Sequence, residues 1–264
     1  MDDVAEEEPG QPGGVGRASS EPIESNGRAP ISAGRDRTVA IHQPNYLPWL
    51  GYFQKIHRSD VFVLLDDAEY SSDSWINRNK IKTPDGWTWL TVPVHGSDEP
   101  IADVEIADDR WADKHRKSIQ ASYGGAAHYD EFADFFAETY VRSWESLCEL
   151  NVHLIRELSE RIGLECQFVR ASTLDVDATN SERIVRLCDE VDADRYFSGE
   201  GARSYNDHDR FEAVDIALEY QSIEHPRYEQ RFDDFVPNLS IVDVLMNVGA
   251  EGTYDLLRSV TADE

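Results

Sequence analysis

The stretch IHQPNYLPWLGYFQKI, residues 41–56, links a predicted strand to a predicted helix. The apolar run TVAIH, residues 38–42, leads into it and is typical of a short buried strand. Pro44 and Pro48 exclude regular structure from the loop that follows. From Trp49 onward, apolar residues recur at helical spacing. The stretch therefore predicts a strand, a stiff loop and a helix in succession.

A second apolar run, DVFVLL at residues 60–65, predicts another buried strand directly after this helix. A strand, a helix and a strand in such close succession are typical of a βαβ unit with parallel strands. Further along, INRNKIKTPDGWTWLTVPV at 76–94 predicts two strands joined by a turn at 84–86. The remaining predicted elements are helices at 109–122, 129–162 and 180–190, strands at 166–171, 195–198 and 216–221, and a last helix after Ser240.

This alternation of helices and short apolar strands predicts an α/β fold. We expect a mostly parallel sheet flanked by helices, in a nucleotide-binding-like three-layer sandwich, with the β-hairpin as an insertion or a sheet edge. Residues 1–37 hold six of the 16 glycines and four of the 11 prolines, with few large apolar residues. They predict a disordered acidic head before one folded domain at 38–264.

The charge of the chain is strongly negative, at −27, from 52 acidic and 25 basic residues. The acids are spread along the whole chain, and only five of the basic residues are lysines. Such a surface is typical of salt adaptation, because molar salt screens the self-repulsion. We therefore infer a halophilic source. The missing basic footprint argues against nucleic acid as a partner.

Several classes of protein are disfavoured by composition. No apolar run reaches the length that a membrane span needs, and the acidic start MDDVAEEEPGQ is unlike a secretory signal. We therefore expect a cytoplasmic protein. Cys148, Cys166 and Cys188 are too few and too far apart for a disulfide framework or a metal site, so we expect buried thiols and no metal.

The first candidate site is the loop after the first strand. Ligands of open α/β sheets bind at the carboxyl ends of strands near a switch in strand order, where His42 and Gln43 are expected. The helix near Trp49 would direct free N–H groups and its positive end to the same place. His42 could donate to a phosphate or act in acid–base catalysis. The structural alternative is a turn whose histidine satisfies backbone groups.

The second candidate is SWINRNKIK, which carries Asn77, Arg78, Lys80 and Lys82. Retained lysines are informative in so acidic a chain, and Arg78 offers a fork for a carboxylate or phosphate. In a regular strand, Asn77 faces one side while Arg78 and Lys80 face the other. The alternative is an ordinary solvated strand face.

The third candidate is YFSGEGARSY, residues 196–205, in which a predicted strand runs into glycines that allow a ligand to approach the backbone. Glu200 is a candidate base and Arg203 a candidate anion clamp. Glycine also serves many loops that bind nothing, so that alternative stays open.

Five segments together carry a more specific signal than any one of them. They are IHQPNYLPWLGYFQKI, VFVLLDDAEY, WINRNKIKTPDGWTWLTVPV, YFSGEGARSY and FVPNLSIVDVLMNVG. In order and spacing they resemble the WbqC-like family across about residues 38–250. The family positions carried by these motifs are His42, Gln43, Asn45, Tyr46, Asn77, Arg78, Lys80, Ser198, Gly199, Gly201 and Tyr205.

The resemblance implies a role in assembling O-antigen or other surface polysaccharides, as a transferase of an acyl or aminoacyl group to a nucleotide-activated amino sugar. We expect His42 and Glu200 in catalysis and the other named residues in binding of a sugar or nucleotide-sugar. The alternative is a non-catalytic sugar- or nucleotide-binding protein in a glycan-assembly complex. No cofactor and no oligomeric state follow from the sequence.

Overall fold

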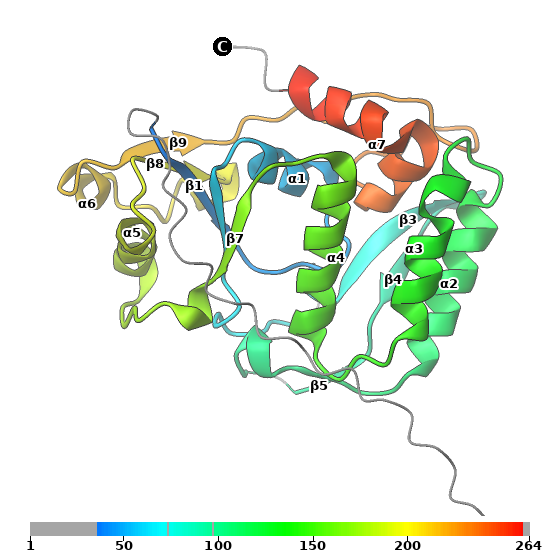
Figure 1. Cartoon of the computed structure of the whole chain (residues 1–264), viewed down its shortest axis with the longest axis horizontal. Coiled ribbons are helices and arrows are strands. Elements are labelled where there is room, and N and C mark those ends of the chain that lie inside the picture. Colours follow the sequence, from blue (N-terminus) through cyan, green and yellow to red (C-terminus); the bar gives the residue numbers. More distant parts are fainter. Residues whose placement is uncertain (1–35, 73, 97, 261–264) are drawn as a thin grey trace, which may run out of the picture. The chain divides into compact units, whose positions relative to one another are not determined.

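The computed structural model describes residues 36–72, 74–96 and 98–260. Most of the predicted head therefore lies outside the described residues. The centre of the fold is a parallel five-stranded sheet in the order β7-β2-β1-β8-β9 (Figure 1). Its strands are β1 (Thr38–His42), β2 (Val61–Leu64), β7 (Gln167–Arg170), β8 (Arg195–Ser198) and β9 (Ala217–Tyr220). The predicted parallel α/β fold is confirmed.

Helices cover both faces of this sheet. The described α-helices are α1 (Leu50–His57), α2 (Arg110–Tyr123), α3 (Tyr129–Val141), α4 (Leu147–Ile162), α5 (Asn180–Glu190), α6 (His208–Glu212) and α7 (Ile241–Ser259). Short 3-10 turns are η1 (Ile101–Asp103), η2 (Ala171–Thr173) and η3 (Glu200–Ala202). In Figure 1, α5 lies on one side of the strands, and α1 and α4 lie on the other.

Alternation along the strands explains the two helical layers. Val39 and Ile41 of β1 pack in a cluster with residues of α5 and α6, whereas Ala40 packs in the larger cluster with α1, α4 and α7. Phe62 and Leu64 of β2 belong to that larger cluster as well. Because both faces are buried, these strands are apolar throughout rather than alternating with polar residues.

The predicted hairpin forms a sheet of its own. β3 (Arg78–Thr83) and β4 (Gly86–Thr91) pair antiparallel, with Gly86 at a φ of 115° in the turn. A second small pair, β5 (Val94–His95) with β6 (Glu105–Ile106), follows it. The hairpin is therefore an insertion and does not extend the edge of the main sheet.

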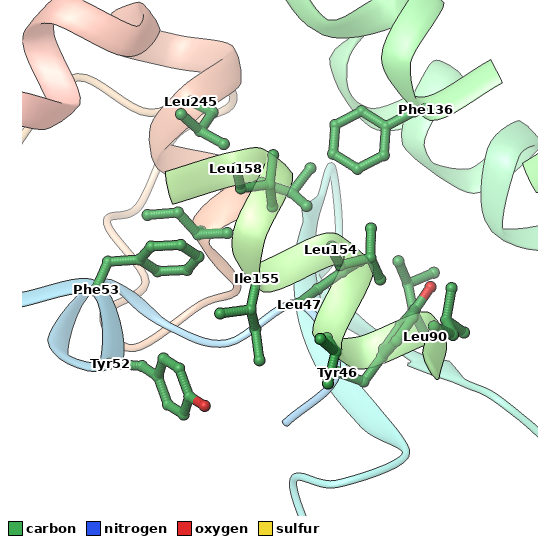
Figure 2. Packing of buried hydrophobic residues seen from close by; sticks show 14 of the residues in the cluster. Tyr46, Leu47, Tyr52, Phe53, Leu90, Phe136, Leu154, Ile155, Leu158 and Leu245 are labelled. Atoms are coloured by element: carbon green, nitrogen blue, oxygen red, sulfur yellow. The ribbon is translucent and has the colours of Figure 1, made fainter. Parts of the chain in front are cut away.

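The loop after β1 is anchored in the core rather than exposed. Tyr46 and Leu47 are buried beside Leu154 and Ile155 of α4 (Figure 2). The Asn79 side chain in β3 donates to the carbonyl of Leu47 at 2.7 Å. This packing fixes the direction in which the chain leaves β1 and enters α1.

One predicted helix is in fact two. The expected helix at 129–162 is interrupted by residues 142–146, so that α3 and α4 are separate. Ser146 caps α4, because its hydroxyl accepts a hydrogen bond from the amide of Glu149. The Ser-x-x-Glu spacing is a capping box that predicts this start. The expected end of α4 is confirmed, since Gly163 is left-handed at a φ of 85°.

The last helix begins after Ser240, as predicted. Ser240 caps α7 by accepting from the amide of Val242, and the helix bends at Gly249, whose φ is 75°. The carboxylate of Asp243, in the first turn, accepts hydrogen bonds from Tyr123 and Tyr228. No helix in the described part of the chain combines the length and apolarity needed to span a bilayer.

Candidate functional site

The strand order places a switch point between β1 and β8. From β1 the chain adds β2 and then β7 on one side, and it returns to add β8 and β9 on the other. Loops that leave β1 and β8 at their carboxyl ends therefore diverge and open a crevice, which is where ligands bind in such sheets. A cavity of about 410 Å³ lies there. Its walls are His42, Trp49, Gly51, Tyr52, Lys55, Gly199, Glu200, Gly201, Gln221, Ser222 and Ile223.

Lys55 is the least expected of these residues. It lies on α1 one turn after Gly51, so both face the cavity. The residue is only 4 % exposed, and its ammonium group has no hydrogen-bond or ion-pair partner among the residues that the structure describes. A Cβ placed on Gly199 would lie 3.7 Å from the Lys55 Nζ. Burial lowers the pKa of Lys55 to about 7, because desolvation disfavours the charged form.

His42 is the last residue of β1 and faces the same cavity. Its Nδ1 lies 3.1 Å from the carbonyl oxygen of Gln43, which can only accept, so Nδ1 carries the proton. The Tyr52 ring meets the imidazole edge-on at 4.9 Å between centroids. Burial, and then the charge of Lys55, lower the pKa of His42 to about 3, against the opposing effect of the Gln43 hydrogen bond.

A neutral imidazole with its proton on Nδ1 leaves Nε2 as an acceptor. That atom has no partner within the described chain. Near pH 7 His42 is therefore neutral, and its Nε2 is free to accept a hydrogen bond or a proton from a ligand in the cavity.

Glu200 lines the cavity from η3 but lies at its exposed rim. Its carboxylate accepts two hydrogen bonds from Arg203, at 2.7 and 2.8 Å. Arg203 in turn lies over the ring of Tyr220, 4.0 Å from its centroid. The pairing with Arg203 lowers the pKa of Glu200, so the group is ionised at neutral pH and holds no proton to donate.

Trp49 and Gln221 complete the walls. The indole of Trp49 lies across Gly51, where any added Cβ would overlap the ring, and it stacks on His225 with 6.3 Å between centroids. The Gln221 amide donates to the carbonyl of Gly51 at 2.7 Å and so ties the end of β9 to α1. The absence of a side chain at Gly51 therefore accommodates Trp49.

The predicted residues of the first loop divide between cavity and core. His42 lines the cavity. The backbone carbonyl of Gln43 accepts hydrogen bonds from His42 Nδ1 and from the Tyr52 hydroxyl. Asn45 is buried and is not among the lining residues. Tyr46 is fully buried, and its hydroxyl lies 2.8 Å from His115 Nδ1 and 2.6 Å from the Tyr140 hydroxyl.

The predicted residues of the hairpin lie elsewhere. Asn77 donates to the carbonyl of Val92 at 3.0 Å. Arg78 lies over Trp89 at 4.6 Å, and Lys80 lies over Trp87 at 4.2 Å. None of these residues lines the cavity. Of the candidate residues, His42 and Gly199 line one cavity and Arg78 does not.

The third segment is divided in the same way. Gly199 and Gly201 line the cavity. Ser198 is buried beneath it and accepts a hydrogen bond from the Asn206 amide at 3.1 Å. Tyr205 is exposed and does not line the cavity, so binding roles for it and for the hairpin residues stay predictions.

Sequence reasoning missed Lys55 and Gln221. A signal for Lys55 was present, because it is one of only five lysines and stands in a helix whose other residues are mostly apolar. No such signal marks Gln221. Within the described ranges, no group of three or more His, Cys, Asp or Glu side chains is placed to hold a metal ion.

Comparison with known proteins gives the chain a family. It is 36 % identical over 227 residues to "Uncharacterized protein Rv1507c" of Mycobacterium tuberculosis (strain ATCC 25618 / H37Rv), covering 84 % of this chain and 98 % of that protein. No solved structure matches it significantly. The sequence model of the WbqC-like protein family matches residues 43–254. This range includes the loop that follows β1, the hairpin and the Gly199–Gly201 turn. This chain therefore belongs to the WbqC-like protein family.

Proposed function

We propose that this protein is a transferase of surface polysaccharide assembly that moves an acyl or aminoacyl group onto the amine of a nucleotide-activated amino sugar. The observation that carries the proposal is His42, whose Nε2 is an unpartnered acceptor in the wall of the switch-point cavity. The polysaccharide setting comes from the family resemblance. A volume of about 410 Å³ suits one sugar-sized group, within the range of ligand sites.

Acyl transfer to an amine needs one group that acts first as a base and then as an acid. The sugar amine attacks the carbonyl carbon of an activated acyl donor, such as a thioester, and a C–N bond forms. His42 Nε2 takes the proton that the nitrogen sheds. The bond between the acyl carbon and its carrier then breaks, and the imidazolium returns the proton to the leaving group. A histidine with a low pKa is unprotonated before the reaction, and its imidazolium is a strong acid afterwards.

The test is complementation of a deletion strain, read by mass spectrometry of surface glycans. The deletion and the His42→Ala variant should lack an acyl or aminoacyl substituent that the wild-type gene restores. His95→Ala is the matched control, because His95 is exposed and outside the cavity, and it should restore the substituent. Unchanged glycans in the deletion strain, or in a folded His42→Ala variant, would refute the proposal.

The rival role is a non-catalytic sugar- or nucleotide-binding protein. An assay with purified protein and an amino-sugar nucleotide, found by thermal-shift screening, distinguishes this role from that of a transferase. Under our proposal, adding an acyl thioester converts the bound sugar to its N-acyl product. Binding without any covalent change across the series of donors would favour the rival.

A further inference from the structure

The cavity contains a lysine amine, Lys55, for which the described residues supply no counter-charge. Among the described residues that line the cavity, Glu200 is the only carboxylate, and it is already paired with Arg203. β1 contributes the neutral His42 to the cavity wall. α1 contributes Tyr52, whose phenol is uncharged because burial raises its pKa. The segment after β9 contributes only uncharged residues, 221–223. Lys55 therefore faces no group that neutralises it.

The ammonium group of Lys55 adds no polar contact to the fold. It makes no hydrogen bond within the described chain, and it lies beside Gly199, where an added Cβ would be 3.7 Å from Nζ. A buried and unpaired charge is costly, and proteins rarely keep one without a partner. In a chain of net charge −27, a carboxylate could easily have been placed beside it. These observations point to a partner that arrives from outside.

We propose that Lys55 is the binding residue for an anionic group of the substrate, a carboxylate or a phosphate, seated in the cavity against Gly199. This inference rests on the proposed function and names the residue that would bind the anionic group of its substrate. The first turn of α1 supports it, because Gly51 lies there and the positive end of the helix faces the same cavity. A nucleotide-activated sugar carries such phosphates, and an acidic sugar carries such a carboxylate.

Binding of an anion at Lys55 would also change the protonation of the cavity. The charge of Lys55 is one of the causes that lower the pKa of His42. An anion beside Lys55 neutralises that charge and raises the pKa of Lys55 itself. Substrate binding then takes up a proton near neutral pH. The other charged pair at the rim, Glu200 with Arg203, stays ionised throughout.

The test is calorimetric titration of the full chain with two probes, pyrophosphate and glucuronate, at constant sodium chloride. We expect one of them to bind the wild-type protein, with proton uptake at pH 7.5 measured from buffers of different ionisation enthalpy. Lys55→Met should weaken that binding at least about 10-fold and abolish the proton uptake. Lys117→Met, which changes an exposed lysine on α2, should bind as the wild type does.

The two probes distinguish a phosphate from a carboxylate as the recognised group. Binding of neither probe to the wild type, or equal binding to a folded Lys55→Met variant, would overturn the inference. The outcome is separable from the proposed function. If Lys55→Met binds normally while His42→Ala loses the glycan substituent, only the inference fails. If Lys55→Met loses binding while His42→Ala leaves glycans unchanged, only the proposed transfer fails.

Discussion

Replacing Lys55 by methionine is expected to stabilise the fold, the opposite of what most core substitutions do. Methionine has a similar length and no charge, and Lys55 has no polar partner to lose in the described chain. The pKa of Lys55 falls from 10.5 to about 7, a change of about 3.5 units. At about 1.4 kcal/mol per unit, the penalty at pH 7 is at most about 5 kcal/mol. We expect a gain of about 2–5 kcal/mol in the free energy of unfolding.

The free energy of unfolding is also expected to change with pH in a defined direction. Between pH 7 and 10.5 the unfolded chain keeps the Lys55 proton while the folded chain has lost it. The unfolded state then binds about one proton more, so wild-type stability rises with pH by about 1.4 kcal/mol per unit from this group. Below pH 7 both states hold the proton and the penalty is constant. The advantage of the Lys55→Met variant should therefore be full at pH 6.5 and shrink steadily toward pH 10.

The assay is urea unfolding followed by tryptophan fluorescence at fixed salt, for wild type and variant at each pH. Subtracting the two free energies cancels groups that titrate identically in both proteins. The control Lys117→Met should differ from wild type by no more than about 0.5 kcal/mol at any pH, since that lysine is exposed. A Lys55→Met variant that is less stable, or whose advantage does not vary with pH, would refute the reasoning.

Two further predictions concern the core and the surface. Tyr46→Phe removes the hydroxyl between His115 and Tyr140 and should lower the free energy of unfolding by about 1–2 kcal/mol, measured by urea unfolding; an effect as small as that of Tyr205→Phe, an exposed control, would contradict it. The excess of acidic residues should make the fold less stable in dilute buffer than in molar salt. Thermal unfolding across a salt series measures this, and a melting temperature independent of salt would contradict the predicted halophilic surface.

Local patterns accounted for most of the fold. The strands at 38–42 and 195–198 were predicted residue for residue, because each is an apolar run closed by turn-forming residues. The break between α3 and α4 was missed, although the spacing of Ser146 and Glu149 marks it. Apolar periodicity continued across the break and concealed it.

The candidate site was predicted in part. His42 and Gly199 were expected at strand ends, and the parallel order of β1 and β8 brings them to one cavity. Arg78 and Lys80, the candidates of the second segment, lie outside this cavity, because the hairpin pairs with itself and holds them against its own tryptophans. Strands pair with partners that can lie far apart in the chain, and the pattern of neighbouring residues does not show which partner a strand takes.

The sequence by itself determined the elements, the buried faces of the strands and the polar loop IHQPNYLPW after β1, because these depend on neighbouring residues. Only the tertiary structure decided that Lys55 is buried without a polar partner among residues 36–72, 74–96 and 98–260. That property depends on Gly199 and Gln221, about 150 residues away, meeting α1 at the switch point. A lysine on a helix is ordinarily solvated, and the loss of its water comes from these distant segments alone.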